Sequence, residues 1–549
     1  MRWWGWLALL LVFLLVLVSV ATSTFFQPWL KKKLITTVAE KSQGLYALQI
    51  SHLEASLWSG RLALEDFSLT PDTARLAELQ KSNQPQAPAM YAQIKAHRLQ
   101  ISGLNYLHLL RGTAPALQKV RLDDARVEVN QVRKDTSTLP LYARLPQPVQ
   151  GLSIDQIHLR HVDFLYKKHG QKASLAEIKK ATLQVQNVKL DSGSARAKDR
   201  FFYAQEMRFQ AQSLNVLLPQ ALYRLKKGPV SASTKDQSLS FQKVQLVPLY
   251  TPAQLARKLG HQTSHFKIYI PQVQFTGADF LAYSRNTELL VEKVLIRGAR
   301  LDIYKDSKHF PSAPQPLPHD LLRKVPLPLT FQTVENRGTF IRYEELTSKA
   351  EETGVVTVSD LNATGTNLSN VPKRMSAKTP AVVKGNFKIM GKAFMQVSIR
   401  YNLLDPAGRH FIQGSVKKSY PAILNPILEP SMAVRVKSGT LHHGAFSMQL
   451  SDASASGTMR LQYEDFKVDL LSKSKLKEED QQSFGKKVLS KLVNKVVINT
   501  HNMPQNGKFR VGKIEVTRDP EKSIIRYWID GLSSGIRSTL GIKEKKMKE

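Results

Sequence analysis

The residues of this chain that could do chemistry are mainly histidines and acidic pairs, because cysteine is absent. Without cysteine there are no disulfides, no thiolate chemistry and no Cys-based metal sites. His261 and His265 have the i, i+4 spacing of a zinc-protease helix, but the Glu of that motif is missing between them. His158 and His161 flank an expected turn, and His442-His443 are adjacent. We therefore interpret these histidines as surface residues.

No other catalytic constellation is present. Asp123-Asp124 occupies a position where a turn is expected, and Asp is favoured in turns for local hydrogen-bonding reasons. The chain has no GxSxG motif, no phosphate-binding loop and no GxGxxG motif after a strand. The expectation is a protein that is not an enzyme, with no catalytic, cofactor-binding or metal-binding residues and no cofactor.

A recurring pattern carries most of the information about the fold. The stretch VQFTGADFLAY (Val273 to Tyr283) is followed by VLIRGARLDIY (Val294 to Tyr304), and in both the apolar positions alternate, skip two residues and alternate again. Alternation is the period of a half-buried strand. The skip has the length of a tight hairpin turn, and a β-bulge at the same place would also explain it. Either structure gives a sheet with one apolar and one polar face.

Related stretches occur at 120–129 and 157–166, and shorter versions at 99–107 and 336–343, with irregular spacing that does not fit a strict solenoid. The residues expected to line one apolar surface, and to contact lipid in a trough, are Val273, Phe275, Phe280, Val294, Ile296 and Leu301. The polar residues expected on the opposite face or in turns are Arg297, Arg300 and Asp302.

The charge balance favours anionic partners. The chain has 79 Lys+Arg against 44 Asp+Glu, a formal net charge of +35. The basic residues are spread along the strands, and no helix-turn-helix, zinc-finger or RNP signature is present. A solvated polar sheet face rich in Lys explains the charge better than a nucleic-acid groove does, so no nucleic-acid partner is expected.

The N-terminal residues predict a single membrane span. An uninterrupted apolar run from Trp3 to Ala21 has about the 20 residues that a span requires, although Ser19 to Ala21 also resembles a cleavage site. The basic run Lys31 to Lys33 would place the body in the cytoplasm by the positive-inside rule, whereas a long β-rich body without Cys is easier to place outside, and we expect it outside. The residues assigned to the anchor are Trp3, Trp4, Trp6, Leu10, Phe13 and Leu17.

Four regions follow from these patterns. Residues 1–29 are the transmembrane anchor, 30–345 and 346–475 are β-rich regions, and 476–549 is a basic amphipathic helical region. Short helices are expected from Leu30 to Glu40 and after Thr251-Pro252, where Thr caps the helix and Pro takes its first position. The basic amphipathic segments Ser483 to Ile498 and Ser523 to Ile542 either lie on anionic membranes or cap the open end of a sheet.

By these residues the chain resembles the AsmA-like superfamily of bacterial envelope proteins, including its domain-of-unknown-function relatives. The resemblance rests on the anchor leading into GLYALQISHLEASLWSGRLALEDFSLTPD, on the VLIRGARLDIY-type strands, and on GTMRLQYEDFKVDLL with the closing RYWIDGLSSGIRSTLG. It implies an inner-membrane anchor, a periplasmic body of curled β-sheet with an apolar interior, and a role in carrying phospholipid or supporting outer-membrane assembly.

The expected fold is therefore mainly β with minor α: an N-terminal transmembrane helix, an elongated, curled antiparallel sheet with a trough-like apolar interior, and C-terminal amphipathic helices. Three functions remain open. The first is a protein that holds or guides phospholipid, with the inner membrane and other envelope proteins as partners. The second is an assembly factor or scaffold with a dry core, and the third, supported only by charge, is a membrane-bound nucleic-acid-binding protein.

Overall fold

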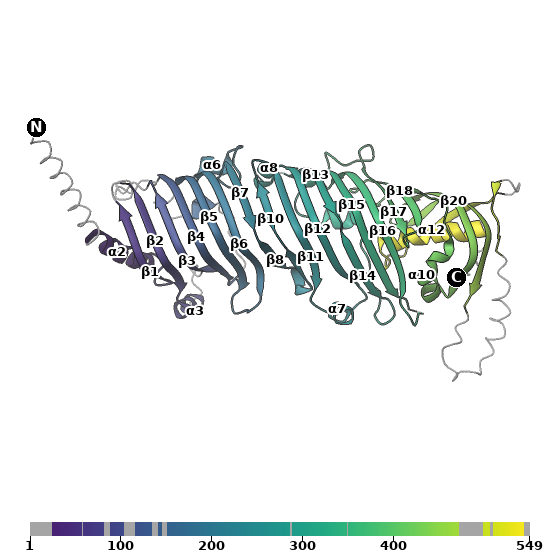
Figure 1. The fold of residues 1–549 in the computed structure, drawn as a ribbon, viewed down its shortest axis with the longest axis horizontal. Coiled ribbons are helices and arrows are strands. Elements are labelled where there is room, and N and C mark those ends of the chain that lie inside the picture. The colour runs from purple at the N-terminus through teal and green to yellow at the C-terminus, as the bar shows by residue number, and fades with distance from the viewer. Residues whose placement is uncertain are drawn as a thin grey trace, which may run out of the picture. The chain divides into compact units, whose positions relative to one another are not determined.

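The computed structural model describes residues 25–56, 59–81, 88–103, 116–133, 141–144, 151–285, 288–348, 350–471, 498–504 and 509–542. The chain divides into two compact units, which are described separately below. Unit 1 comprises Met1–Gln242 and Asp279–Arg285, and unit 2 comprises Lys243–Ala278 and Asn286–Glu549. Both are built mainly from strands, as predicted, with few helices (Figure 1).

Unit 1 contains a sheet whose first six strands pair in chain order (Figure 1). Its strands are β1 (Tyr46–Ser56), β2 (Arg61–Pro71), β3 (Met90–Ser102), β4 (Ala116–Gln131), β5 (Ser153–Lys168), β6 (Ser174–Lys189), β7 (Glu206–Ala211), β8 (Ser213–Leu217), β9 (Tyr223–Lys227), β10 (Val230–Ser233) and the first part of β11 (Ser238–Pro248). Its helices are α2 (Gln27–Lys41), α3 (Thr73–Lys81), α5 (Leu141–Arg144), α6 (Ser192–Arg196), the 3-10 turn η3 (Pro219–Ala221) and α8 (Phe280–Ser284).

Unit 2 contains a second long run of paired strands. They are β12 (Ser264–Ala278), β13 (Leu289–Arg297), β14 (Arg300–Asp306), β15 (Leu329–Leu346), β16 (Gly354–Ser369), β17 (Ala381–Ile389), β18 (Ala393–Tyr401), β19 (His410–Val416), β20 (Val434–Leu450), β21 (Ser454–Leu470) and β22 (Val511–Thr517). The helices are α7 (Pro252–Leu259), α9 (Pro318–Arg323), η4 (Pro421–Leu424), α10 (Asn425–Met432) and α12 (Ile524–Leu540). From β15 to β22 each strand pairs antiparallel with the next.

The expectation of a purely antiparallel sheet is wrong, because the sheet is mixed. β4 pairs parallel with β5 in unit 1, and β15 pairs parallel with β13 and β14 in unit 2. Parallel neighbours need a connection that returns to the starting end of the sheet, usually a dozen or more residues. Residues 132–152 and 307–328 are long enough to do this.

The hairpin interpretation of the repeat is also wrong. Thr276 and Gly277 lie within the continuous strand β12, so the chain does not reverse there. Gly277 has a φ of 63° and Gly298 a φ of 64°. A single residue in this left-handed conformation turns the next side chain back to the face it would otherwise leave. The two-residue skip is therefore a kink inside β12 in the first copy and between β13 and β14, which both pair with β15, in the second, and this is closer to the bulge alternative.

Non-glycine residues make the same kink in the other copies of the pattern. Asp124 in β4 and His161 in β5 have φ values of 49° and 54°, and both occupy the second of the two skipped positions. Asp and His are among the residues that tolerate this conformation best. The expected turn at Asp123-Asp124 is consequently a kink within β4.

The helix predictions are confirmed where the structure describes them. α2 covers the expected helix near Leu30, and α7 begins at Pro252 with a capping box formed by Thr251 and Gln254. Among the described residues, no helix is long and apolar enough to cross a membrane. The predicted anchor from Trp3 to Ala21 lies outside the described residues, and so does the segment Ser483 to Ile498 apart from its last residue.

Candidate functional site

Four rows of apolar side chains cross strands β1 to β6 on one face of unit 1. Residues opposite each other in neighbouring strands point to the same side of a sheet, so the strand register defines the rows. In strand order they are Leu48, Leu69, Ile94, Val127, Phe164, Ile178; Ile50, Phe67, Ala96, Ala125, Val162, Ala181; Leu53, Leu64, Leu99, Leu122, Leu159, Leu183; and Ala55, Leu62, Ile101, Val120, Ile157, Val185. We call this surface the apolar face of unit 1.

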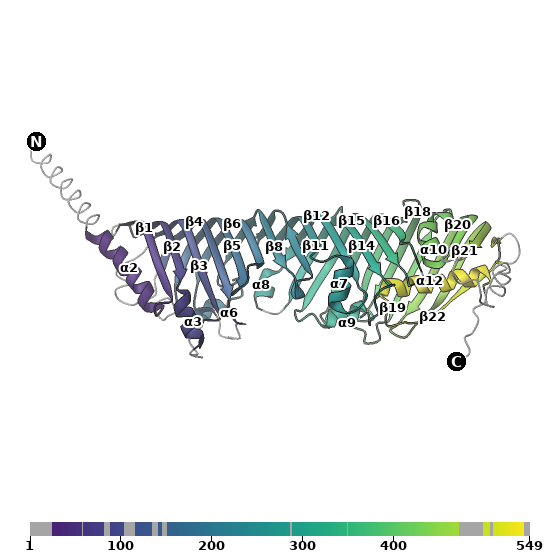
Figure 2. The ribbon, with the colours of Figure 1, turned by 90° about the horizontal axis from the view of Figure 1, so that it is seen from below.

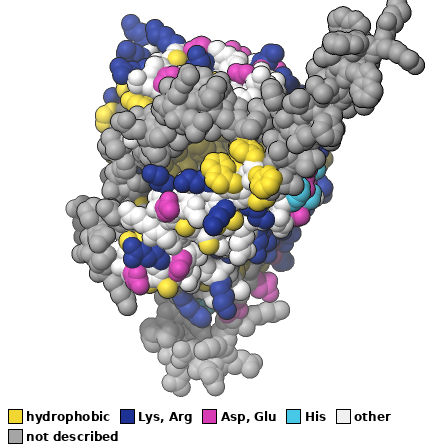
Figure 3. All heavy atoms as spheres, turned by 90° about the vertical axis from the view of Figure 1, so that its left-hand side faces the viewer, with side chains coloured by type: hydrophobic (Ala, Val, Ile, Leu, Met, Phe, Trp, Pro, Cys, Tyr) yellow, Lys and Arg dark blue, Asp and Glu magenta, His cyan; other side chains and the backbone are white. Residues whose placement is uncertain are grey.

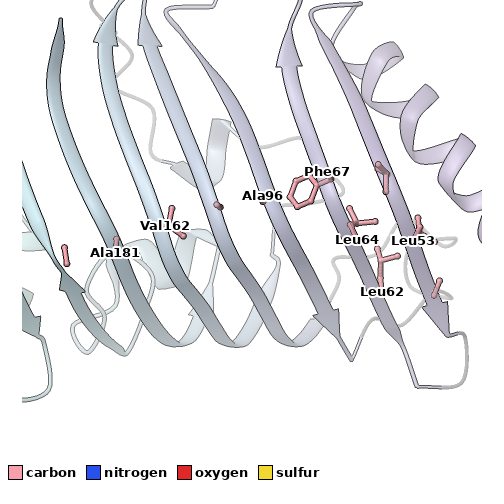
Figure 4. Packing of buried hydrophobic residues seen from close by; sticks show 11 residues of the cluster. Leu53, Leu62, Leu64, Phe67, Ala96, Val162 and Ala181 are labelled. Carbon is pink, nitrogen blue, oxygen red and sulfur yellow. The ribbon is translucent and has the colours of Figure 1, made fainter.

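The kinks keep all four rows on that one face. Leu122 and Ala125, for example, are three positions apart and would point to opposite sides of a regular strand, but Asp124 between them is left-handed. The second row then continues through small side chains from Ala96 to Ala181 and to Ala211 of β7, between rows of larger residues. Figure 4 shows these side chains on one side of the strands.

The apolar face is only partly covered. Its buried members keep between 3 and 9% of their surface exposed, and many larger members, such as Ile94, Leu99 and Leu122, are only half-buried. One helix packs against this cluster, α2, through Phe26, Leu30, Leu34 and Ile35. A one-sided sheet must bury its apolar face against another layer or against something else that is apolar. Among the described residues, α2 lies against the rows at the β1 end, and Tyr203 and Ala204 belong to one cluster with Val120, Ile157, Leu183 and Val185.

The opposite face of the same strands is polar and internally ion-paired. Glu65, Arg98, Asp123 and Arg160 follow one another across β2 to β5, and neighbours pair at 3.6 Å (Arg98 Nε to Glu65 Oε1) and 3.7 Å (Arg160 Nε to Asp123 Oδ1). Arg121 adds a 2.7 Å contact from its Nε to Asp123 Oδ2. Opposite charges directly across strands stabilise a sheet. These charges are therefore part of the structure of this face.

A shallow furrow of about 550 Å³ follows the kinks on this polar face. In it His97 Nδ1 lies 2.9 Å from Asp66 Oδ1, and His161 Nδ1 lies 3.3 Å from Asp124 Oδ1. The hydrogen bond to Asp66 and its charge raise the pKa of His97. Both pairs are largely exposed. Within the described part of the chain, no group of three or more His, Asp or Glu side chains is arranged to hold a metal ion.

Five of the six predicted lining residues lie on strands β12, β13 and β14 of unit 2. Val273 lies opposite Ile296 and Phe275 opposite Val294 in the pairing of β12 with β13. Leu301 lies on β14, opposite Ile268 of β12. These pairs place the strand residues on shared faces.

Phe280 is the exception, because it leaves the sheet. It is the first residue of α8, in unit 1, with Asp279 as the cap: the Asp279 carboxylate accepts from the Ala282 amide at 2.8 Å. Its ring packs edge-on against Phe201 at 5.7 Å between centroids. Phe280 therefore does not share a strand face with Val273, because β12 ends at Ala278. Of the predicted polar residues, Arg297 and Arg300 are exposed, and Arg300 Nε pairs with Asp302 Oδ2 at 3.1 Å.

The far strands of unit 2 carry a second apolar cluster, and here a helix covers it (Figure 2). The cluster consists of Ile412, Met448, Leu450, Ala455, Met459, Ile514 and Tyr527, and none of these is more than 3% exposed. Tyr527 belongs to α12, and Gly531 and Gly535 let that helix approach closely. A Cβ on Gly535 would stand 2.9 Å from Ile514 Cγ1 and 3.0 Å from Met459 Cβ. Such distances leave no room for a side chain.

Polar contacts fix α12 in this position. The Ser538 hydroxyl accepts from the Lys513 amide at 2.9 Å, and Ser534 Oγ donates to Glu515 O at 3.0 Å, so α12 binds backbone groups of the last strand, β22. An edge strand with unpaired backbone groups is open to pairing with other chains. These contacts agree with the alternative in which segment Ser523 to Ile542 caps the open end of a sheet.

A buried histidine anchors the same helix. Trp528 Nε1 donates to His410 Nε2 at 2.9 Å, and because indole can only donate, the other ring nitrogen of His410 donates to Gly408 O at 2.7 Å. Burial lowers the pKa of His410, with a smaller contribution of the same sign from His319. The neutral ring is therefore the form that fits this site.

The surface interpretation of the histidines is wrong for His265. It is 5% exposed, its Nε2 lies 3.1 Å from Tyr250 O, and burial lowers its pKa. His265 is the second residue of β12. It does not lie on a helix with His261, because α7 ends at Leu259 with Gly260 as a left-handed cap. The i, i+4 spacing thus places no two imidazoles on one helical face.

No protein-family model matches the chain, and no curated protein matches it.

Two features of the site were missed by the sequence analysis. A signal for several kinks was present, since the second skipped position is a residue that tolerates positive φ at Gly277, Gly298, Asp124 and His161, although Lys180 makes the kink in β6. The close packing of α12 on the sheet is also indicated in the sequence by Gly531, Ser534 and Gly535, which are small residues on one helical face. Which strands receive that face depends on distant contacts that the local pattern does not contain.

Proposed function

We propose that this protein is anchored in the inner membrane, lies in the periplasm, and holds or guides phospholipid on the apolar face of unit 1, as part of lipid homeostasis of the cell envelope. The observation that carries the proposal is the set of four apolar rows across six strands that remain partly exposed. The resemblance to AsmA-like envelope proteins points in the same direction.

The chemistry of the face suits acyl chains. Each methylene moved from water to an apolar surface contributes about 0.8 kcal/mol, so a chain lying across several strands could be held without any specific polar contact. The register provides a continuous surface: a leucine stands at the same level on each of β1 to β6. This chemistry selects for an apolar chain and leaves the headgroup unspecified.

A scaffold with a dry core is the second candidate, and α12 on the second cluster is the observation that favours it. If a helix or partner protein covers the first cluster in the same way, no lipid is needed. The nucleic-acid alternative gains no support from the polar face of unit 1, where acidic and basic side chains alternate.

Native mass spectrometry of the full chain after gentle extraction and detergent removal tests the proposal. We expect bound phospholipid in the wild type and much less in Leu122→Asp, which puts a carboxylate into the leucine row. Lys95→Ser, an exposed position on the polar face, is the matched control and should retain the lipid. Wild-type protein free of lipid would contradict lipid holding and favour the scaffold. An export-dependent reporter fused after Glu549 should be active if the body lies in the periplasm.

A further inference from the structure

The helix α2 has two different faces. On one face Phe26, Leu30, Leu34 and Ile35 pack against the apolar cluster of unit 1. On the other side Phe25, two residues before the helix begins, and Trp29, four residues further on, are 78% and 59% exposed. An end view from the side of α2 shows large hydrophobic side chains in the middle of this face, next to Lys and Arg (Figure 3).

The hold of α2 on the sheet is weak. None of its 15 residues is buried, in contrast to α12, which buries six. A hydrogen bond from Lys31 Nζ to Ser51 O, at 3.0 Å, joins the helix to β1. Beneath it lie Ile50, Leu53 and Ala55, which begin the apolar rows. An apolar chain could cover these residues as well as α2 does.

The exposed side of α2 has the chemistry of a lipid interface. Aromatic side chains that are apolar with a polar edge, such as Trp, are enriched at the headgroup level of membranes. Lys31, Lys32 and Lys33 follow directly, and no acidic residue stands before Glu40. Lysines close to an anionic leaflet are attracted to its surface. The apolar run Trp3 to Ala21 ends only a few residues before Phe25, so the membrane anchor expected there would bring α2 to a membrane surface.

We propose that α2 is a displaceable cover that lies with its exposed side on an anionic phospholipid surface and, when displaced from β1, admits acyl chains to the apolar face at that end. The inference rests on the proposed lipid-holding function. It adds the loading end and the class of lipid surface, neither of which follows from the apolar rows alone.

Cross-linking tests the cover directly, because the chain has no native cysteine. Lys31→Cys with Ser51→Cys, bridged by a short bismaleimide, ties α2 to β1 in the full-length protein. We expect the bridged protein to take up fluorescent phospholipid from vesicles containing phosphatidylglycerol at least tenfold more slowly than the unbridged double variant. Ser68→Cys with Lys95→Cys, opposite positions of β2 and β3 on the polar face, is the matched control and should load normally when bridged.

A second variant tests the lipid surface. Phe25→Ser with Trp29→Ser changes only exposed side chains and should slow loading from anionic vesicles several-fold, while lipid already bound is retained.

Loading at the wild-type rate by the bridged Lys31→Cys/Ser51→Cys protein would overturn the cover but leave lipid holding intact. Equal loading of the wild type from phosphatidylcholine vesicles would overturn the anionic surface. Wild-type protein that takes up no lipid from either vesicle would overturn the proposed function and the cover with it.

Discussion

The helices α2 and α12 both pack on apolar strands, but they pack in different ways. α12 brings two glycines onto its sheet, binds the backbone of β22 through serines and leaves its cluster no more than 3% exposed. α2 brings no small residue to the contact, and many members of the cluster that it packs on, which spans β1 to β7, stay only partly buried. This chain can therefore cover an apolar sheet surface fully with its own residues, and it does so at α12 but not at α2.

The largest effect is expected from breaking the seal at α12. Gly535→Val places a branched side chain where even a Cβ would stand 2.9 Å from Ile514. We expect a loss of about 3 kcal/mol in the free energy of unfolding, at the upper end for overpacking. Thermal melting followed by Trp fluorescence measures it. Ser533→Ala, a half-buried position whose hydroxyl donates to Ile529 O of the same helix, should be nearly neutral. Equal melting of Gly535→Val and wild type would contradict the tight seat.

Matched substitutions in the two clusters sharpen the comparison. Ala455→Phe, beneath α12, should cost about 2 kcal/mol by overpacking. Ala125→Phe, in the small-residue row of unit 1, should change stability by less than about 1 kcal/mol, because the added ring can displace the partly buried side chains beside it, such as Leu122 and Val127, which no tightly seated helix holds in place. It should, however, lower the amount of bound lipid. If Ala125→Phe destabilises as much as Ala455→Phe, the apolar face of unit 1 is as closely packed as the second cluster.

Much of the apolar face could be predicted from the sequence, but the mode of its construction could not. Alternation at Leu301-Asp302-Ile303 and the skip before Ala299 predicted the one-sided strands. A hairpin and a left-handed kink produce the same skip, and the kink is possible here because neighbouring strands bend at the same level, as at Asp66, Asp124 and His161. The parallel pairing of β4 with β5 could not be predicted either, because it depends on non-local register, which the sequence pattern of neither strand encodes.

The smallest effect concerns pH, which should act on the two regions in opposite directions. The pKa of His97 is raised by Asp66, so its contribution to stability is complete below the unfolded value of about 6.5 and is lost as pH rises through the raised value. The pKa of His410 is lowered by burial, so its contribution is complete above about 6.5 and is lost as pH falls toward the lowered value.

Hydrogen exchange between pH 5 and pH 8 separates these two effects. Peptides of α12 should exchange faster at the acid end, and peptides of β2 and β3 near Asp66 slightly faster at the alkaline end. His97→Gln should remove the second change without affecting the first. Faster exchange of both regions at the same end of the pH range would show that these two histidines do not control the dependence.

Photo-cross-linking with a phospholipid that carries a diazirine in its acyl chain tests the central claim most directly. The full-length protein is loaded from vesicles, irradiated, digested and mapped by mass spectrometry. We predict labelled peptides from β2 to β6, including Leu64, Leu122 and Leu159 of the leucine row, and little label at Met448, Met459 or Ile514 beneath α12. Equal labelling of both clusters, or labelling that spares the leucine row, would contradict the account.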